Sequence, residues 1–270
     1  MSEASELEKE IHSLFPNYKN KELHKCNLAL SKRAITLDAG NLSRLLLEQL
    51  QKKENFKLRC NAEVNSINYS RSTGLVNSVS ILGKIGQEIK ADAIVFCTGA
   101  HTARALKSTL GIYAPITPIK SYTFEVGTET QHSPTHLIFH NSALTASFVE
   151  PGMWRMSTFG DIAGLSLDFD NRRVRTAKNV ACVSIDTNEG LMAQNMKAVL
   201  RACSPDDMPV VGALKSNPNI YVNSGHGGRN CALSIGSSKL VSELLSDGKL
   251  KSCDEPQLVQ QSIAPLRFQM

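Results

Sequence analysis

Three glycines within four positions follow an apolar run near the carboxyl end of the chain, where a helical pattern begins. The segment 224–228 reads SGHGG and comes directly after the strand-like run 220–223. Glycine lets a backbone approach a ligand closely, and the N–H groups at a helix start favour anions and electron-rich carbonyls. The pattern predicts a ligand-facing turn, and a plain strand-to-helix turn is the alternative. It is not a GxGxxG fingerprint, because Asn230 occupies the last position.

Arg201 opens a polar loop, 201–209, that leads into a second apolar run. A guanidinium can bind a carboxylate through two parallel hydrogen bonds, so Arg201 is a candidate for holding an acidic substrate. The alternative is a surface ion pair with a neighbouring acid such as Asp206 or Asp207. From spacing alone we favour the ion pair, because exposed arginines commonly pair in this way.

The apolar run 93–97 is continuous, which is typical of a strand buried on both faces of a parallel sheet. It leads into Thr98-Gly99-Ala100, a second place where the backbone could meet a ligand. Taken alone this turn is a weak signal, because most such turns merely end a strand.

Two other patterns point to less specific roles. His132, His136 and His140 are spaced four apart, which on a helix would align metal ligands. The β-type run between the last two opposes a helix, so we expect strand or loop histidines and no metal site. A hydrolase that uses Ser224 and His226 is a third possibility. Neighbouring groups on a tight turn cannot easily form a nucleophile–base pair with a third, orienting residue.

Hydrophobic patterns divide the chain into an α/β part, a mainly antiparallel part and a second α/β part. Helices are expected at 2–14, 38–53, 101–109, 187–200 and 233–245. Strands are expected within 56–70, 75–82, 87–89, 93–97, 119–126, 136–140, 145–149, 154–159 and 220–223. The order predicts an α/β (α+β) fold in which a substrate domain interrupts one nucleotide-type domain.

Composition is that of an ordinary globular protein, with 270 residues, 41% hydrophobic and 20% charged. The net charge of +5 is spread along the chain, so no nucleic-acid partner is expected. No apolar run is long enough to span a bilayer, and the acidic N-terminus is not a secretory signal. Seven cysteines without a CxxC pair argue against a disulfide framework. We expect a reducing, cytoplasmic location; mitochondrial or peripheral membrane association stays open.

The two C-terminal segments together resemble a known family. Residues 201–212 and 219–228 are similar to the signature of the D-amino-acid dehydrogenase, glycine oxidase and sarcosine oxidase group of FAD enzymes, the DAO family. That signature reads roughly R-P-x-T-P-D-x-x-P-x-I-G, a spacer, then N-x-x-x-N-x-G-H-G. The resemblance extends over nearly the whole chain, from about residue 5 to about residue 249, and the C-terminal signature is its most specific part.

Upstream, residues 91–100 resemble the family's strand ending in A-x-G, 118–122 its P-V-K-G-Y segment, and Glu63-Val64 the strand whose backbone meets adenine. The resemblance implies an incomplete FAD-binding Rossmann-like domain with an inserted antiparallel-sheet substrate domain. The implied domains are 1–114 (partial FAD-binding domain), 115–200 (substrate domain) and 201–270 (return to the FAD-binding domain). The cofactor-binding positions it implies are Val64, Thr98, Gly99, Gly225, His226, Gly227 and Gly228.

The resemblance also implies a reaction. Arg201 matches the arginine that holds the substrate carboxylate, which raises it above the ion-pair alternative, and Tyr122 is a weaker candidate for lining the pocket. FAD would take a hydride from a D-amino acid, or from a glycine- or sarcosine-like amine. The imino acid then hydrolyses to a 2-oxo acid and ammonia, and a quinone, a dye or oxygen accepts the electrons. The substrate side chain, the choice between oxidase and dehydrogenase, and the oligomeric state stay open.

The sequence departs from the family pattern at several places. Ala202 replaces the usual proline, Ser121 the usual glycine, and Arg229-Asn230 alter the turn after the glycines. No GxGxxG occurs, and Met1 falls where the family is past its first βαβ unit, so we expect a truncated chain with an exposed sheet edge. Such a chain would bind FAD poorly. The alternative is a non-catalytic remnant, or a partner subunit, of a flavoenzyme.

Overall fold

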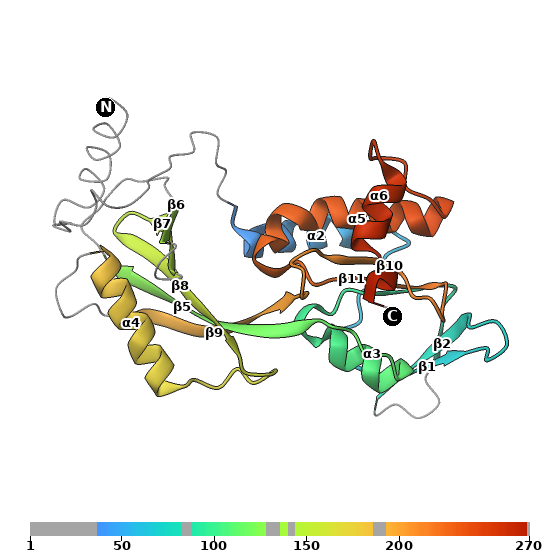
Figure 1. Ribbon diagram of the computed structural model, residues 1–270, viewed down its shortest axis with the longest axis horizontal. Helices are drawn as coiled ribbons and strands as arrows, with labels where there is room; N and C mark the ends of the chain where they lie inside the picture. Colours follow the sequence, from blue (N-terminus) through green and yellow to red (C-terminus); the bar gives the residue numbers. More distant parts are fainter. Residues whose placement is uncertain (1–36, 83–87, 128–135, 140–143, 186–192, 269–270) are drawn as a thin grey trace. The chain divides into compact units, whose positions relative to one another are not determined.

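The computed structural model describes residues 37–82, 88–127, 136–139, 144–185 and 193–268 (Figure 1). The helix expected at 2–14 lies outside them. The chain divides into two compact units. Unit 1 contains the described parts of 120–161 and 166–199, and unit 2 those of 37–119, 162–165 and 200–270. The domain limits expected from the sequence stay a prediction.

Both units contain helices and strands. The helices are α2 (Ala39–Gln51), α3 (Thr102–Leu110), α4 (Asn171–Ile185), α5 (Asn230–Asp247) and α6 (Pro256–Ile263), with the short 3-10 turns η2 (Gly99–His101), η4 (Gly227–Arg229) and η5 (Pro265–Phe268). The first strands are β1 (Val64–Tyr69), β2 (Val76–Ile81), β3 (Glu88–Lys90), β4 (Ile94–Phe96) and β5 (Thr117–Gly127). The others are β6 (His136–Phe139), β7 (Leu144–Glu150), β8 (Met153–Ile162), β9 (Gln194–Cys203), β10 (Val210–Ala213) and β11 (Ile220–Ser224).

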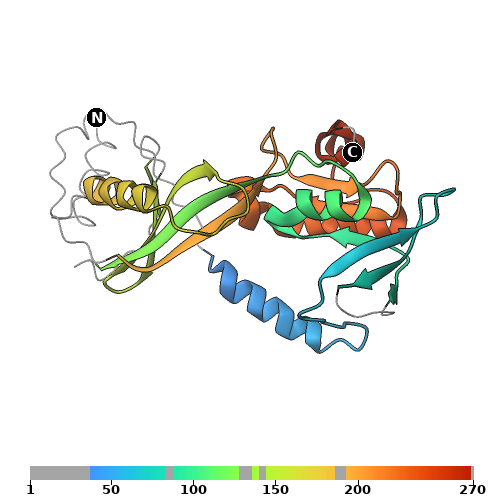
Figure 2. The same ribbon diagram turned by 90° about the horizontal axis from the view of Figure 1, so that it is seen from below.

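Unit 1 is built on a five-stranded sheet in the order β6-β7-β8-β5-β9. The pairs β6/β7 and β7/β8 are antiparallel, as expected for this part of the chain. Helix α4 lies along the sheet (Figures 1 and 2), and its Ala177 and Ala181 pack into a core with Phe124, Trp154 and Met156. The alanines allow close approach because their side chains are short.

Unit 2 has a central three-stranded sheet in the order β10-β11-β4, in which β11 runs parallel to β4 and antiparallel to β10. Side chains alternate between its faces, as the period of a strand requires. Val222 of β11 and Leu106 of α3 belong to one core cluster, whereas Tyr221 packs on the other face with Val241 of α5 and Ile263 of α6. The sheet is therefore covered on both sides, and β4 forms one of its edges.

The small antiparallel sheet β1-β2-β3 belongs to the same unit. Asn219 connects the two sheets: its Oδ1 accepts from the Val76 N–H at 2.9 Å, and its Nδ2 donates to the Asp92 carbonyl at 2.7 Å. Asn217 adds a bond to the Gly74 carbonyl at 2.8 Å. The first asparagine of the C-terminal signature thus has a structural role.

Helix α2 begins where the sequence predicts. Asp38 is its N-cap, and the carboxylate accepts from the Asn41 N–H at 3.0 Å. Its leucine stripe is exposed in the described part of the chain, where Leu45, Leu46 and Leu50 are 43%, 53% and 46% exposed. Within the described chain, no residue of α2 is buried, and Figure 2 shows the helix standing apart from the rest of the unit.

One expected helix is wrong. Residues 194–203 form strand β9, and the helix of this region lies earlier, as α4. Helix-favouring residue types fill the segment, although Met196, Ala198, Leu200 and Ala202 recur at every second position, which is the period of a strand. Pairing beside β5 decides the outcome. The expected α/β fold class, with a partial Rossmann-like domain, is confirmed.

Among the residues that the structure describes, no helix combines the length and apolar character needed to cross a bilayer.

Candidate functional site

The two glycine turns lie next to each other. Strands β4 and β11 are parallel and in register, with Ile94 opposite Ile220 and Phe96 opposite Val222. Their carboxyl ends therefore meet at one edge of the sheet, which is where open α/β sheets bind ligands. Gly99 follows the end of β4, and the segment 225–228 follows the end of β11. Gly99 and Gly225 are 126 residues apart in the sequence.

Three hydroxyl groups connect the turns. Ser224 Oγ donates to the Gly99 carbonyl at 3.1 Å and accepts from Thr102 Oγ1 at 2.9 Å. Thr102 Oγ1 lies 3.0 Å from Thr98 Oγ1, which must donate because the Thr102 hydrogen is already used. The Ser224 hydroxyl is thus engaged, and the residue is only 2% exposed. It is a structural link and not a nucleophile, which leaves the hydrolase hypothesis without support.

The glycines of the site have two different environments. Gly225 and Gly227 are buried and have φ of +78° and +59°. A Cβ at Gly227 would lie 2.7 Å from Asp207 Oδ1, and one at Gly225 would lie 3.4 Å from the Val210 side chain. These two glycines make room for the chain's own loop. By contrast, Gly99 has φ of +54° and open space where a Cβ would stand.

We name the two adjacent glycine turns, 98–100 and 225–228, the glycine corner. Gly228 is exposed at this corner, and Arg201 lies beside it, half-buried. Cys203, the last residue of β9, makes an isolated antiparallel bridge to His226, which sets the end of β9 beside the turn. Arg201 lies two residues earlier on the same face of the strand. Its Nη1 is 3.8 Å from the position that a Cβ of Gly228 would take. The structure therefore brings the predicted carboxylate-binding arginine to the glycine corner.

The acids proposed as alternative partners of Arg201 bond to other arginines. Arg267 contacts Asp206 at 2.8 Å, and Arg229 contacts Asp207 at 2.7 Å. The Arg267 guanidinium lowers the pKa of Asp206 to about 2. Both arginines were missed by the sequence-based site prediction. Arg267 lies 61 residues beyond its partner, and no local pattern signals such a pairing.

His226 is held by the helix that follows it. Its Nε2 lies 2.8 Å from Ser237 Oγ, which in turn donates to the Ser234 carbonyl at 3.1 Å. Because the serine hydrogen is used there, Nε2–H is the donor toward Ser237. Burial lowers the pKa of His226, which favours the neutral form of the ring. Burial also raises the pKa of the Cys203 thiol, and nearby Asp207 adds to this shift.

Two further predicted site residues belong to strands β1 and β5. Val64 is the first residue of β1, in the small sheet of unit 2. Tyr122 belongs to unit 1, where it is fully buried and its ring stacks on Phe169 with centroids 6.2 Å apart. Its hydroxyl accepts from the Asp170 N–H at 3.3 Å. These contacts give Tyr122 a packing role within its own unit.

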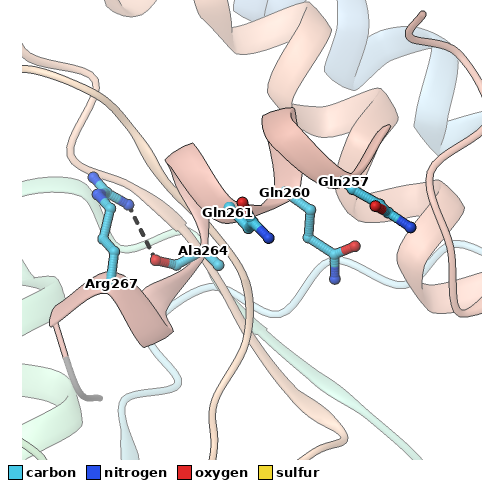
Figure 3. A pocket seen from close by; sticks show the side chains of 5 residues that line it. All are labelled: Gln257, Gln260, Gln261, Ala264 and Arg267. Carbon is cyan, nitrogen blue, oxygen red and sulfur yellow. Dashed lines mark hydrogen bonds between the residues drawn. The ribbon is translucent and has the colours of Figure 1, made fainter. Parts of the chain in front are cut away.

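Among the described residues, no cluster of side chains suits a metal ion. His136 lies on β6, as a strand, with Nδ1 2.6 Å from Ser147 Oγ. His132 and His140 lie outside the described residues. The depression drawn in Figure 3 is lined by Gln257, Gln260, Gln261, Ala264 and Arg267. These lining residues belong to α6, η5 and the residue between them, and none of them belongs to the glycine corner.

Solved structures share this fold. L-proline dehydrogenase from P. horikoshii is 18% identical with a TM-score of 0.62, over 77% of this chain and 54% of that one. Glycine oxidase from Geobacillus kaustophilus is 18% identical with a TM-score of 0.59, over 72% and 50%. Iminodiacetate oxidase from Chelativorans sp. BNC1 is 15% identical with a TM-score of 0.62, over 72% and 51%. The chain thus spans about half the length of these proteins.

The family match covers most of the sequence. Residues 2–244 match the family described as FAD dependent oxidoreductase, DAO, and FAD is the cofactor that defines this family. The signature segments that form the glycine corner lie inside the matched range. The chain therefore belongs to the DAO family of FAD-dependent oxidoreductases.

Proposed function

We propose that this chain supplies the flavin-facing corner and the substrate clamp of an enzyme that oxidises amino acids or related amines. The substrate class we favour is D-amino acids, or glycine- and sarcosine-like amines. The observation that carries this proposal is the position of Arg201, whose Nη1 lies next to Gly228 at the shared edge of two parallel strands. A cation beside a glycine corner suits an anionic substrate that must lie flat against a cofactor.

The residues at this corner fit FAD. Gly99 combines a left-handed backbone with open space, so a bulky group can approach its N–H without meeting a side chain. Thr98 and Gly99 would lie at the pyrophosphate, and Gly228 with His226 would lie toward the ring and ribityl chain. Val64 is proposed at the adenine. When bound, the flavin supplies the acceptor for the hydride that leaves the substrate.

Arg201 would hold the substrate through its carboxylate. Two parallel N–H···O bonds fix both the position and the plane of the carboxylate. The Cα–H bond then breaks with its electron pair, while the lone pair of the neutral amine forms the C=N bond of the imino acid. Water adds to this bond, and hydrolysis releases a 2-oxo acid together with ammonia, or with the substituted amine when the substrate nitrogen carries an alkyl group. No carboxylate base is required, and the electron acceptor that regenerates the cofactor is a quinone, a dye or oxygen.

Tyr122 is retained only as a second-rank proposal for the substrate pocket. Its complete burial and its bond to the Asp170 N–H favour packing within unit 1. A Tyr122→Phe variant separates the two roles, because loss of the hydroxyl alone would change KM only if it reaches the substrate.

The test begins with the purified chain. We expect visible flavin absorbance, either as isolated or after addition of FAD, and dye-linked oxidation of D-amino acids or glycine. Arg201→Lys should raise KM by about ten- to a hundredfold, because an ammonium cannot form the two parallel bonds. The matched control is Arg44→Ala on α2, where the guanidinium pairs with Glu48 one turn away and is 60% exposed.

A non-catalytic remnant or partner subunit is the second candidate. It is favoured by the packing of Gly225 and Gly227 against the chain's own loop, which explains two of the glycines without a ligand. A folded, colourless chain that leaves the fluorescence of added FAD unchanged would select this candidate over the enzyme.

A further inference from the structure

Arg267, in η5 near the carboxyl end, uses every N–H of its guanidinium. A guanidinium has five such donors. Nε and Nη2 donate to the Asp206 carboxylate at 2.8 and 3.1 Å, and Nη2 also donates to the Met208 carbonyl at 2.7 Å. Nη1 donates to the carbonyls of Ile263 at 2.7 Å and Ala264 at 3.2 Å. The Ala264 bond is the dashed line in Figure 3.

The partners of Arg267 belong to the segment that covers the buried glycines. Asp206 and Met208 flank Asp207, whose Oδ1 fills the space beside Gly227. The same segment is folded on itself, because Ser204 Oγ donates to the Met208 carbonyl at 2.6 Å. We name residues 204–208 the cover loop. The position of the cover loop determines how much space is left beside Gly225 and Gly227.

A second arginine also contacts the cover loop, but from a more exposed position. Arg229 donates to the Asp207 carbonyl at 2.5 Å and to its carboxylate at 2.7 Å, with the two side chains 52% and 65% exposed. Ion pairs this exposed contribute little. The Arg267 side chain is only 13% exposed, and its bonds to three backbone carbonyls do not depend on the carboxylate alone. Arg267 therefore holds the cover loop more firmly than Arg229 does.

We propose that Arg267 is a positioning residue for the cofactor corner: it fixes the cover loop, and the cover loop in turn fixes the turn Gly225–Gly228. Arg267 lies beyond residue 244, where the family match ends. The effect on FAD binding rests on the function proposed above. The effect on the backbone of the glycine turn rests only on the contacts of Arg267, Asp206 and Asp207.

Hydrogen exchange followed by mass spectrometry tests the backbone effect. Arg267→Lys keeps the positive charge but not the five-donor fork, and Arg267→Ala removes both. We expect amide exchange to become faster, by about tenfold or more, in peptides that cover residues 204–210 and 225–230. The amides of Asp207 and Met208 are internally bonded in the wild-type chain and report directly on the loop.

The matched control is Arg155→Ala, which removes another arginine–carboxylate pair, Arg155 with Glu125 at 2.7 Å, in unit 1. It should leave exchange at 225–230 unchanged. If Arg267→Ala unfolds the whole chain, the lysine variant decides. Faster exchange restricted to 263–268, with 225–230 unaffected, would overturn the proposal.

Titration with FAD, followed by flavin fluorescence, tests the consequence for the cofactor. We expect Arg267→Lys to weaken FAD binding by about tenfold, with Arg155→Ala equal to the wild type. If the wild-type chain does not bind FAD, the proposed function fails while hydrogen exchange still decides the positioning role. If the wild type binds FAD and the lysine variant binds equally well despite faster exchange at 225–230, Arg267 does not position the cofactor corner.

Discussion

The two glycine turns of unit 2 follow neighbouring parallel strands, yet they have opposite surroundings. The turn at Gly99 opens onto free space, whereas Gly225 and Gly227 are buried under the chain's own residues 204–210. Both turns use the left-handed backbone that favours glycine. A glycine at a candidate site can therefore serve a ligand or a neighbouring loop, and only the space beside it shows which.

This difference separates stability from binding within one site. Substitutions at the covered turn should mainly affect folding, and substitutions at the open turn should mainly affect the cofactor. The hydroxyl groups of Thr102 and Ser224 lie between the two turns and should couple them.

The largest effect is expected for Gly227→Ala. The new Cβ would meet Asp207 Oδ1 at 2.7 Å in a backbone with φ of +59°. Strain and the displaced contact together should lower the free energy of unfolding by about 2–4 kcal/mol, measured by urea denaturation. Gly236→Ala is the control, because it lies in helix α5 with nothing within 4 Å of the new atom. It should stabilise the chain by about 0.5–1 kcal/mol. Equal losses in both variants would contradict the distinction.

The next largest effect is expected when the hydrogen bond between Thr102 and Ser224 is removed. Ser224→Ala leaves the Thr102 hydroxyl and the Gly99 carbonyl without their partner, and Thr102→Val removes the other end of the bond. Each should cost about 1–2 kcal/mol because Thr102 and Ser224 are buried. The double variant should cost less than the sum, since both changes remove the same bond. A double-mutant cycle in urea measures this coupling, and strict additivity would show that the two turns are independent.

Gly99→Ala should be milder for folding but stronger for the ligand. Its left-handed backbone costs about 1 kcal/mol with a side chain, and the open space accommodates the methyl group. The methyl group would occupy the approach to the Gly99 N–H, so FAD affinity should fall by about tenfold or more. Urea denaturation and FAD titration of the same sample separate the two effects. An unchanged affinity would place the cofactor elsewhere.

The smallest expected effect is on the stability of the chain at low pH. The pKa of Asp206 is lowered from 3.8 to about 2 by the Arg267 guanidinium, so the unfolded chain binds its proton first. The stability that this carboxylate contributes is complete above about pH 4 and is lost as the pH falls toward 2. Glu125, Glu243 and Asp247, whose pKa values are also lowered, add to the acid sensitivity. The difference in urea midpoint between wild type and Asp206→Asn should therefore shrink below about pH 4.

Much of this site could be predicted from local sequence. The apolar runs before Gly99 and Gly225 predicted two strands, of which β11 is largely buried and β4 is a partly buried edge strand. Their parallel pairing was enough to bring the two turns together. The Asp38 cap and the leucine period likewise predicted α2. Local signals of this kind depend only on neighbours along the chain.

The remainder depends on contacts between distant segments. Nothing near Asp206 indicates that Arg267, 61 residues away, is its partner. Strand β9 contains many helix-favouring residues, and its pairing beside β5 outweighs their propensity. The packing role of Gly227 could not be predicted either, because the atom that requires a glycine there belongs to Asp207.

The uncovered leucine stripe of α2 has a practical consequence for handling the protein. Leu45, Leu46 and Leu50 form an exposed apolar surface on this helix in the folded chain. Dyes that fluoresce on apolar surfaces should stain the native chain at low temperature. A high starting signal in a dye-based melting assay therefore does not report misfolding of this protein, and its thermal transitions are better followed by circular dichroism.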